Sequence, residues 1–200
     1  QEVEVIPNSV DHAVFHAPGR GKQSAPTVGF LYSRNPQKGT RLCIEAIERA
    51  RREVPELRVL AFGPDEPTPD LPLPAGTRYA SRVAEDALRG IYGACDAWLF
   101  GTHREGFGLP ILEAMACRTP VIATPAGAAP ELIAPGGGAL VPRDDPAAMA
   151  SEIVRVARLA EPAWRRMSDT AHQTSTSWTW TDAAGRFEDF LERQLTTVAP

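Results

Sequence analysis

The sequence predicts an α/β domain built on a parallel sheet, and the spacing of its chain breakers is the first reason. The chain of 200 residues contains 19 Pro and 16 Gly, which recur along its whole length. Between them, short runs rich in β-formers alternate with longer segments of helical periodicity, a pattern typical of βαβ units. A chain of this length is also expected to form one domain around a single core.

The composition argues against several other classes of protein. Hydrophobic residues make up 43% and charged residues 23% of the chain, as in ordinary globular domains. The net charge of −4 disfavours nucleic acid as a partner, because proteins that bind duplexes usually carry a basic face. No apolar run approaches the roughly 20 residues of a membrane span, and no secretory signal opens the chain.

The three cysteines, Cys43, Cys95 and Cys117, fit no metal or redox motif by their spacing. Each lies in an apolar segment, so we expect three small buried side chains in a reducing compartment, and hence a cytoplasmic protein. The first residue is Gln1 rather than Met, which leads us to expect a fragment of a longer protein.

Apolar runs and helical periodicity divide the chain into alternating elements. Strands are predicted over residues 27–31, 57–62, 77–80, 96–100, 120–123 and 139–141, and residues 3–6 are either a short strand or an extended linker. Helices are predicted over residues 38–54, 84–94, 109–117, 128–134, 146–160, 162–173 and 180–195. We therefore divide the chain into an interdomain linker (1–25), a domain (26–176) and a C-terminal helix (177–200).

The turn between residues 101 and 108 contains the most informative pattern. It follows a predicted strand and opens a predicted helix, whose free N–H groups and dipole attract anions. Gly106 and Gly108 let the backbone approach a ligand closely. Glu105 in the turn and Glu113 one turn into the helix can accept hydrogen bonds from sugar or ribose hydroxyls. The alternative is a plain strand–turn–helix corner with Glu113 as a solvated helix residue.

The spacing from Glu105 to Glu113 resembles the Glu-x7-Glu motif of group 1 retaining glycosyltransferases. Residues 114–116, 120–124, 130–133 and 138–141 resemble the same family's continuation, and residues 6–11 with Phe15 resemble its interdomain segment. The resemblance spans about residues 3–160. It implies a doubly wound, Rossmann-like parallel sheet of about six strands with flanking helices, one half of a GT-B glycosyltransferase. The other, N-terminal half would bind the acceptor.

The resemblance also implies roles for the residues of the motif. Glu105 would contact the hydroxyls of the donor sugar, and Glu113 would bind the ribose of the nucleotide. The backbone of Phe107, Gly108 and Leu109, next to Gly106, would meet the sugar and the diphosphate.

The family carries an Arg and a Lys that bind the diphosphate on the loop after the first strand. Lys38 matches the Lys. A cation is disfavoured at a helix N-terminus, which makes a functional role for Lys38 more attractive than that of a solvated lysine. Ser33 stands where the family has its Arg, and Arg34 follows one residue later, so whether Arg34 replaces the family arginine stays open.

Tyr79 begins a turn that corresponds to the family's base-contacting turn. The family usually has Gly at the position of Ser81, so we weigh two roles for Tyr79, a base contact and simple packing.

The expected function is transfer of a hexose from a nucleotide-sugar to an acceptor with retention of configuration. The nucleotide-sugar is the substrate, and no cofactor and no metal are expected. The chain contains no Asp-x-Asp motif, and Asp144-Asp145 is better explained as a helix start. In this interpretation Lys38, Arg34 and Glu105 are the catalytic residues, and the chain alone binds donor weakly and transfers nothing.

Three rival functions remain to be weighed. A sugar-nucleotide epimerase shares the fold, but the pair of glutamates favours transfer. A non-catalytic nucleotide-sugar-binding module is left open by the change at Ser33. A nicotinamide-dependent enzyme is disfavoured, because no Gly-x-Gly-x-x-Gly follows the first strand. The sugar, the base, the acceptor, the oligomeric state and any peripheral membrane association of the whole enzyme are not given by the sequence.

Overall fold

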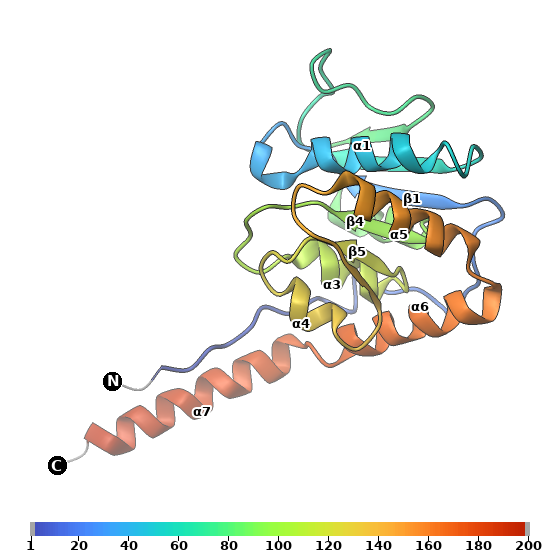
Figure 1. Cartoon of the computed structure of the whole chain (residues 1–200). Coiled ribbons are helices and arrows are strands. Elements are labelled where there is room, and N and C mark those ends of the chain that lie inside the picture. Colours follow the sequence, from blue (N-terminus) through green and yellow to red (C-terminus); the bar gives the residue numbers. More distant parts are fainter. Residues whose placement is uncertain (1–2, 199–200) are drawn as a thin grey trace.

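The computed structural model describes residues 3–198 and contains one six-stranded sheet with the strand order β3-β2-β1-β4-β5-β6. Every neighbouring pair of strands is parallel, as predicted. The strands are β1 (Thr27–Leu31), β2 (Arg58–Gly63), β3 (Arg78–Ser81), β4 (Ala97–Phe100), β5 (Val121–Ala123) and β6 (Gly138–Leu140). The doubly wound, Rossmann-like class is therefore confirmed (Figure 1).

The strand order reverses between β1 and β4, and this reversal positions the site. β1 pairs with β2 on one side, with Leu31 opposite Phe62, and with β4 on the other side, with Phe30 opposite Leu99. The chain leaves β1 toward one half of the sheet and leaves β4 toward the other. In open α/β sheets the crevice between two such diverging connections is where ligands bind.

Helices cover both faces of the sheet. The helices of the body are α1 (Thr40–Ala50), α2 (Glu85–Gly93), α3 (Leu109–Ala116), α4 (Ala129–Ile133), α5 (Pro146–Arg158) and α6 (Glu161–Thr176), and α7 (Trp180–Val198) follows them. Apolar residues of α1 and α5 share one buried cluster with the strands, whereas those of α3 and α4 share a second cluster. α6 joins both clusters, because Trp164 belongs to the first and Ala171 to the second.

The first helix is shorter than the predicted range of 38–54. A single 3₁₀ turn, η1 (Pro36–Lys38), comes first, and α1 begins only at Thr40. Gly39 between them has φ of 64°, a left-handed conformation that interrupts the helix. Lys38 is thus in the turn before the helix, and not in the first turn of the helix as expected. The segment 3–6 is extended but joins no strand of the sheet.

The segment that follows residues 3–6 packs more firmly than a linker. Val10 and Phe15 are buried in the second cluster. Arg20 lies 4.7 Å from the centre of the Trp164 ring and donates to the Thr119 hydroxyl at 2.9 Å. Residues 10–20 therefore belong to the body of the domain, whereas the limits of the proposed domains stay a prediction.

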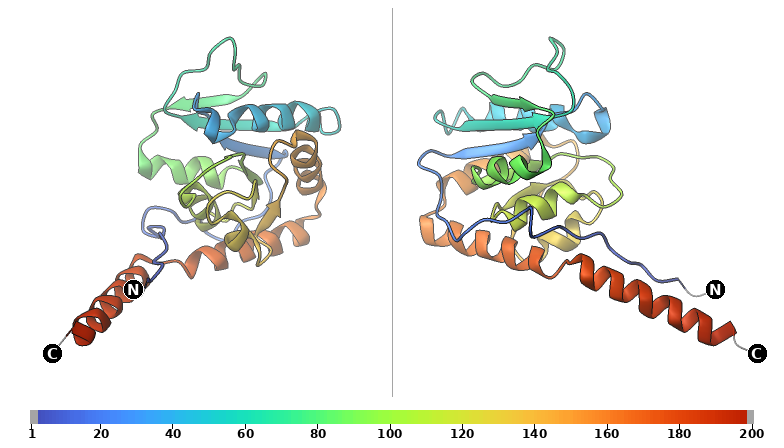
Figure 2. Two further views of the ribbon diagram at one scale, coloured as in Figure 1. Left: turned by 60° about the vertical axis from the view of Figure 1, so that its left-hand side comes forward. Right: turned by 180° about the vertical axis from the view of Figure 1, so that it is seen from behind.

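α7 extends away from the body beside the N-terminal segment (Figures 1 and 2). The two are joined by Arg186, whose guanidinium donates to the Glu4 carboxylate at 3.1 Å and to the Val5 carbonyl at 3.0 Å. Phe187 and Leu191 on α7 are 51% and 44% exposed, so this surface is not covered by the domain itself.

The cysteines are buried and unpaired, as predicted. Burial raises the pKa of the Cys43 thiol to about 12, so this thiol stays protonated at neutral pH. Within residues 3–198, no helix is both long enough and apolar enough to cross a membrane.

Candidate functional site

The loops that follow β1 and β4 meet at the point where the strand order reverses. They line a crevice of about 200 Å³ to which Ser33, Lys38, Glu105 and Pro110 contribute. The Lys38 ammonium donates to the Glu105 carboxylate with an Nζ–Oε2 distance of 2.7 Å. Two residues 67 positions apart in the chain, both predicted as catalytic, are thus brought together.

Close backbone contact holds the two loops at this distance. A Cβ atom on Gly39 would lie 1.8 Å from the Gly101 carbonyl oxygen, so only glycine fits at this point. The His103 N–H donates to the Gln37 carbonyl at 2.9 Å. The register of the loops, and with it the Lys38–Glu105 contact, therefore depends on the backbone rather than on the two side chains alone.

The Lys38–Glu105 pair is partly shielded from water. The Lys38 side chain is 34% exposed and that of Glu105 is 21% exposed. The second oxygen of the Glu105 carboxylate accepts from the Gly106 N–H at 3.2 Å. Lys38 therefore provides a positive charge and Glu105 a negative one, each open to an approaching ligand that offers a better partner.

The start of α3 has the form that an anion site requires. Gly108 caps the helix with φ of 107° and Pro110 follows in the first turn. Within the described residues 3–198, the N–H groups of Phe107, Gly108 and Leu109 donate to no protein acceptor. The turn is fixed from the other side, because the Phe107 carbonyl accepts from the Ala128 N–H at 2.8 Å. These free N–H groups and the helix dipole favour a phosphate or another anion here.

Glu113 lies on α3 but does not line the crevice of Lys38 and Glu105. Its Oε2 accepts a hydrogen bond of 2.6 Å from the hydroxyl of Tyr92, a buried residue of α2. Desolvation by burial raises the pKa of the Glu113 carboxyl, the Tyr92 hydrogen bond lowers it, and the charge of Glu85 raises it. Glu113 is thus not a freely solvated helix residue.

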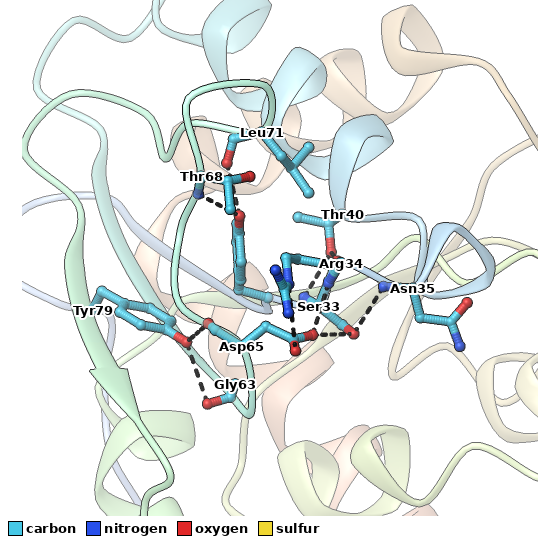
Figure 3. A network of polar contacts seen from close by, with 10 residues as sticks. Ser33, Arg34, Asn35, Thr40, Gly63, Asp65, Thr68, Leu71 and Tyr79 are labelled. Atoms are coloured by element: carbon cyan, nitrogen blue, oxygen red, sulfur yellow. Dashed lines mark hydrogen bonds and ion pairs between the residues drawn. The ribbon is translucent and has the colours of Figure 1, made fainter.

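Ser33 and Arg34 belong to a network around Asp65, which follows β2 (Figure 3). One oxygen of the Asp65 carboxylate accepts from the Ser33 hydroxyl at 3.0 Å and from the Arg34 N–H at 2.8 Å. The Arg34 Nε lies 3.6 Å from the other oxygen, and the guanidinium side chain is 61% exposed. The Arg34 N–H bond and the Ser33 bond lower the pKa of Asp65, which is therefore ionised at neutral pH.

Tyr79 is the second anchor of the same network. Its hydroxyl donates to the carbonyl oxygens of Gly63 and Asp65 (Figure 3). Its ring meets that of Tyr32 edge-on, with the ring centres 5.7 Å apart. These contacts tie β3 to the loop after β2. Tyr79 does not line the crevice of Lys38 and Glu105, and its predicted contact with a base stays a prediction.

Two residues of the site region were missed by sequence reasoning. Asp65 lies in a proline-rich loop without a motif, and Tyr92 lies in a helix as an ordinary apolar position. Each acquires its role from a partner at least 21 positions away in the chain. No local pattern signals such pairs.

A metal site is not apparent in the part of the chain that the structure describes. There, no three side chains of His, Cys, Asp or Glu are grouped as metal ligands require. The arrangement instead offers protein cations and N–H groups for an anionic ligand, and carboxylates for hydroxyl groups.

Comparison with known proteins settles the family. Residues 25–158 match the family of glycosyl transferases described as group 1. The chain belongs to this family. An MMP α-(1→4)-mannosyltransferase from Mycolicibacterium hassiacum is 27% identical over the whole chain, which covers 50% of that relative. The chain spans about half the length of the curated relatives it matches.

Two solved structures extend this comparison to the fold. A sucrose-phosphate synthase from Thermosynechococcus elongatus superposes with a TM-score of 0.79 at 25% identity, over 98% of this chain and 53% of that chain. The C-terminal domain of a group 1 family protein from Francisella tularensis gives 0.68 at 26% identity, over 84% of this chain and 97% of that chain. The domain is therefore one Rossmann-like half of a GT-B glycosyltransferase.

Proposed function

We propose that this chain is the donor-binding domain of a glycosyltransferase that moves a hexose from a nucleotide-sugar to an acceptor with retention of configuration. The observation that carries the proposal is the contact between Lys38 and Glu105 in the crevice beside α3. The crevice thus holds a cation for a diphosphate next to a carboxylate for sugar hydroxyls. Pro110 at the start of α3 lines the same crevice, so the free N–H groups of that helix start adjoin it.

The leaving group of such a donor is a nucleoside diphosphate. When the bond from the anomeric carbon to the phosphate oxygen breaks, the sugar gains positive charge and the oxygen gains negative charge. Lys38 and the N–H groups at the start of α3 stabilise this oxygen, a contribution that is usually the largest in catalysis. The acceptor oxygen then bonds to the anomeric carbon on the face that the diphosphate leaves, and the proton of the acceptor hydroxyl passes to the departing phosphate oxygen.

Glu105 orients the donor rather than attacking it. Its carboxylate accepts from the Lys38 ammonium at 2.7 Å. A bound diphosphate competes for Lys38 because it carries more negative charge, and this frees Glu105 to accept from sugar hydroxyls. Positioning the sugar in this way lowers the entropic part of the barrier.

Independence from metal ions is part of the proposal, because Lys38 supplies positive charge where a divalent ion would otherwise act. The acceptor, and the partner half that binds it, lie outside this chain. Exposed Phe187 and Leu191 on α7 support a contact with that half. Alone, the chain binds donor and transfers nothing. A cytoplasmic location is proposed on its unpaired cysteines.

Calorimetric titration with UDP, GDP, ADP and dTDP, with Mg²⁺ and with EDTA, tests the site. We expect one nucleotide to bind similarly in both conditions. Lys38→Ala should weaken that binding at least about tenfold, as expected for loss of a charge-assisted contact. Arg166→Ala removes the same charge at an exposed position of α6, a helix that does not line the crevice, and should leave binding unchanged.

Three results would contradict parts of the proposal. If Arg166→Ala weakens nucleotide binding as much as Lys38→Ala does, Lys38 contributes only to the net charge of the chain. If the nucleotide binds only in the presence of Mg²⁺, the proposed independence from metal ions is wrong. Binding of no nucleotide by the chain or by the whole enzyme would overturn the donor site. The whole enzyme also separates transfer from the two rivals, since a binding module yields no product and an epimerase alters the donor without an acceptor.

A further inference from the structure

The hydrogen bond between the buried Tyr92 and the partly buried Glu113 has a feature that the motif alone does not explain. Within residues 3–198, Tyr92 provides the only hydrogen bond to the Glu113 carboxylate, and no Lys, Arg or His pairs with it. A partly buried carboxylate without a cation is costly unless its oxygens find donors. One oxygen has such a donor at 2.6 Å, whereas the other has none.

The Tyr92 ring is fixed by aromatic contacts from three separate parts of the chain. Trp98 on β4 lies 4.5 Å from it, Phe62 on β2 lies 5.7 Å from it, and Phe15 of the N-terminal segment lies 6.2 Å from it, all edge-on or steeply tilted. The side chain is fully buried. Its hydroxyl therefore has one direction, and the core rather than the hydrogen bond determines that direction.

The backbone of Tyr92 is anchored as well. Its carbonyl accepts from the Thr119 hydroxyl at 2.7 Å, and Thr119 in turn accepts from the partly buried Arg20 at 2.9 Å. The end of α2 is thus tied to the turn after α3. Tyr92 and Glu113 are held as one rigid unit that spans the two helices.

We propose that Tyr92 is a positioning residue for nucleotide binding: its hydroxyl holds one oxygen of Glu113 and keeps the other turned toward the ribose of a nucleoside diphosphate. This inference rests on the proposed role of Glu113 and adds a residue to it. A neutral donor suits this task, because a cation would satisfy the carboxylate and weaken its hydrogen bonds to the neutral hydroxyls of a ribose.

Tyr92→Phe tests the inference, because it keeps the ring and its packing and removes only the hydroxyl. The measurement is calorimetric affinity of the 200-residue chain for the nucleoside diphosphate that binds best, and for its 2′-deoxy and 3′-deoxy forms. In the unaltered chain we expect the ribose form to bind on the order of tenfold more tightly than at least one deoxy form. In Tyr92→Phe most of this preference should disappear, while the affinity for that deoxy form stays nearly the same.

Tyr32→Phe is the matched control. Tyr32 is also fully buried, but in the first cluster rather than in the second one that holds Tyr92, and its hydroxyl donates to the Leu71 carbonyl at 2.8 Å. We expect this variant to lose stability but to keep the ribose preference. Thermal unfolding of both variants checks that each is folded at the titration temperature.

The outcomes separate the proposed role of Tyr92 from the proposed role of Glu113. A ribose preference that persists in Tyr92→Phe but disappears in Glu113→Gln overturns the role of Tyr92 and keeps that of Glu113. A preference that is absent in the unaltered chain, or that persists in Glu113→Gln, overturns both. A preference lost in Tyr92→Phe and Tyr32→Phe alike makes the effect one of general loosening, and also overturns the inference.

Discussion

Arg34 and Lys38 lie four residues apart on the loop after β1, but their charges are engaged differently. Lys38 reaches into the crevice and contacts Glu105, which a ligand can displace. Arg34 is 61% exposed and lies against Asp65, whose carboxylate also holds the Ser33 hydroxyl. An acidic group so close to the crevice opposes the binding of a diphosphate, because like charges repel. Asp65 therefore both fixes this loop and weakens its attraction for anions.

Asp65→Asn is accordingly expected to raise nucleotide affinity by about threefold to tenfold, since it removes one negative charge and releases Arg34. Arg34→Ala alone should change affinity by less than about threefold, because its exposed guanidinium is already paired. In the Asp65→Asn background, Arg34→Ala should reduce nucleotide affinity more than it does in the unaltered chain. Nucleotide titrations of the unaltered chain, the two single variants and the double variant give the coupling energy between Arg34 and Asp65. A weaker nucleotide affinity in Asp65→Asn would show that Asp65 mainly orders the loop.

The resemblance to the family predicted site residues only at positions that match the family's motifs. Lys38 and Glu105 were both expected from the sequence and do meet. Asp65 and Tyr92 were not expected, because their partners come from other elements and are chosen by three-dimensional packing. Hydrogen bonds between distant elements have no spacing that a single sequence can display.

At the scale of elements, the approach of Gly39 to Gly101 decides where α1 begins. The helical pattern starts at Lys38, and pattern alone therefore predicted a helix from that residue. The structure instead has Gly39 in the left-handed region, because the loops after β1 and β4 pass too closely there for a side chain. Periodicity reports which face of a segment is buried, but it does not report where another backbone crosses it.

Substitution of two glycines can separate the strain of a left-handed backbone from the clash between the two loops. Gly39 and Gly76 have similar φ values of 64° and 71°, but a Cβ on Gly76 would meet nothing within 4 Å. Gly76→Ala should therefore cost about 1–2 kcal/mol of unfolding free energy, the strain of a left-handed alanine. Gly39→Ala adds a backbone clash and should cost roughly 3 kcal/mol or more. Urea unfolding measures both, and equal losses would mean that the loops separate easily.

At the scale of the whole molecule, alternation of strands and helices predicted a parallel sheet, but it could not predict the order of the strands. That order, with its reversal between β1 and β4, is what brings the two loops of the site together. Burial of large side chains distinguishes the compact body from α7. Trp164 on α6 is fully buried, whereas Phe187 and Leu191 on α7 are about half exposed.

α7 is consequently expected to be the least stable helix of the isolated chain. A helix of this length that is not packed along its apolar side is only marginally stable in water. Backbone amides of residues 187–195 should exchange with deuterium at least about 100-fold faster than those of α6, because local opening is governed by local packing. In the whole enzyme the same amides should become protected, if the partner half covers Phe187 and Leu191.

Two controls make this hydrogen-exchange experiment decisive. Exchange in the isolated chain is measured at two protein concentrations, because a second copy could also cover the exposed surface of α7. The amides of α6 provide the internal reference, since Trp164 and Ala171 are buried in the domain itself. If α7 is as protected as α6 at both concentrations, the domain alone stabilises the helix, and the proposed contact with the partner half loses its main support.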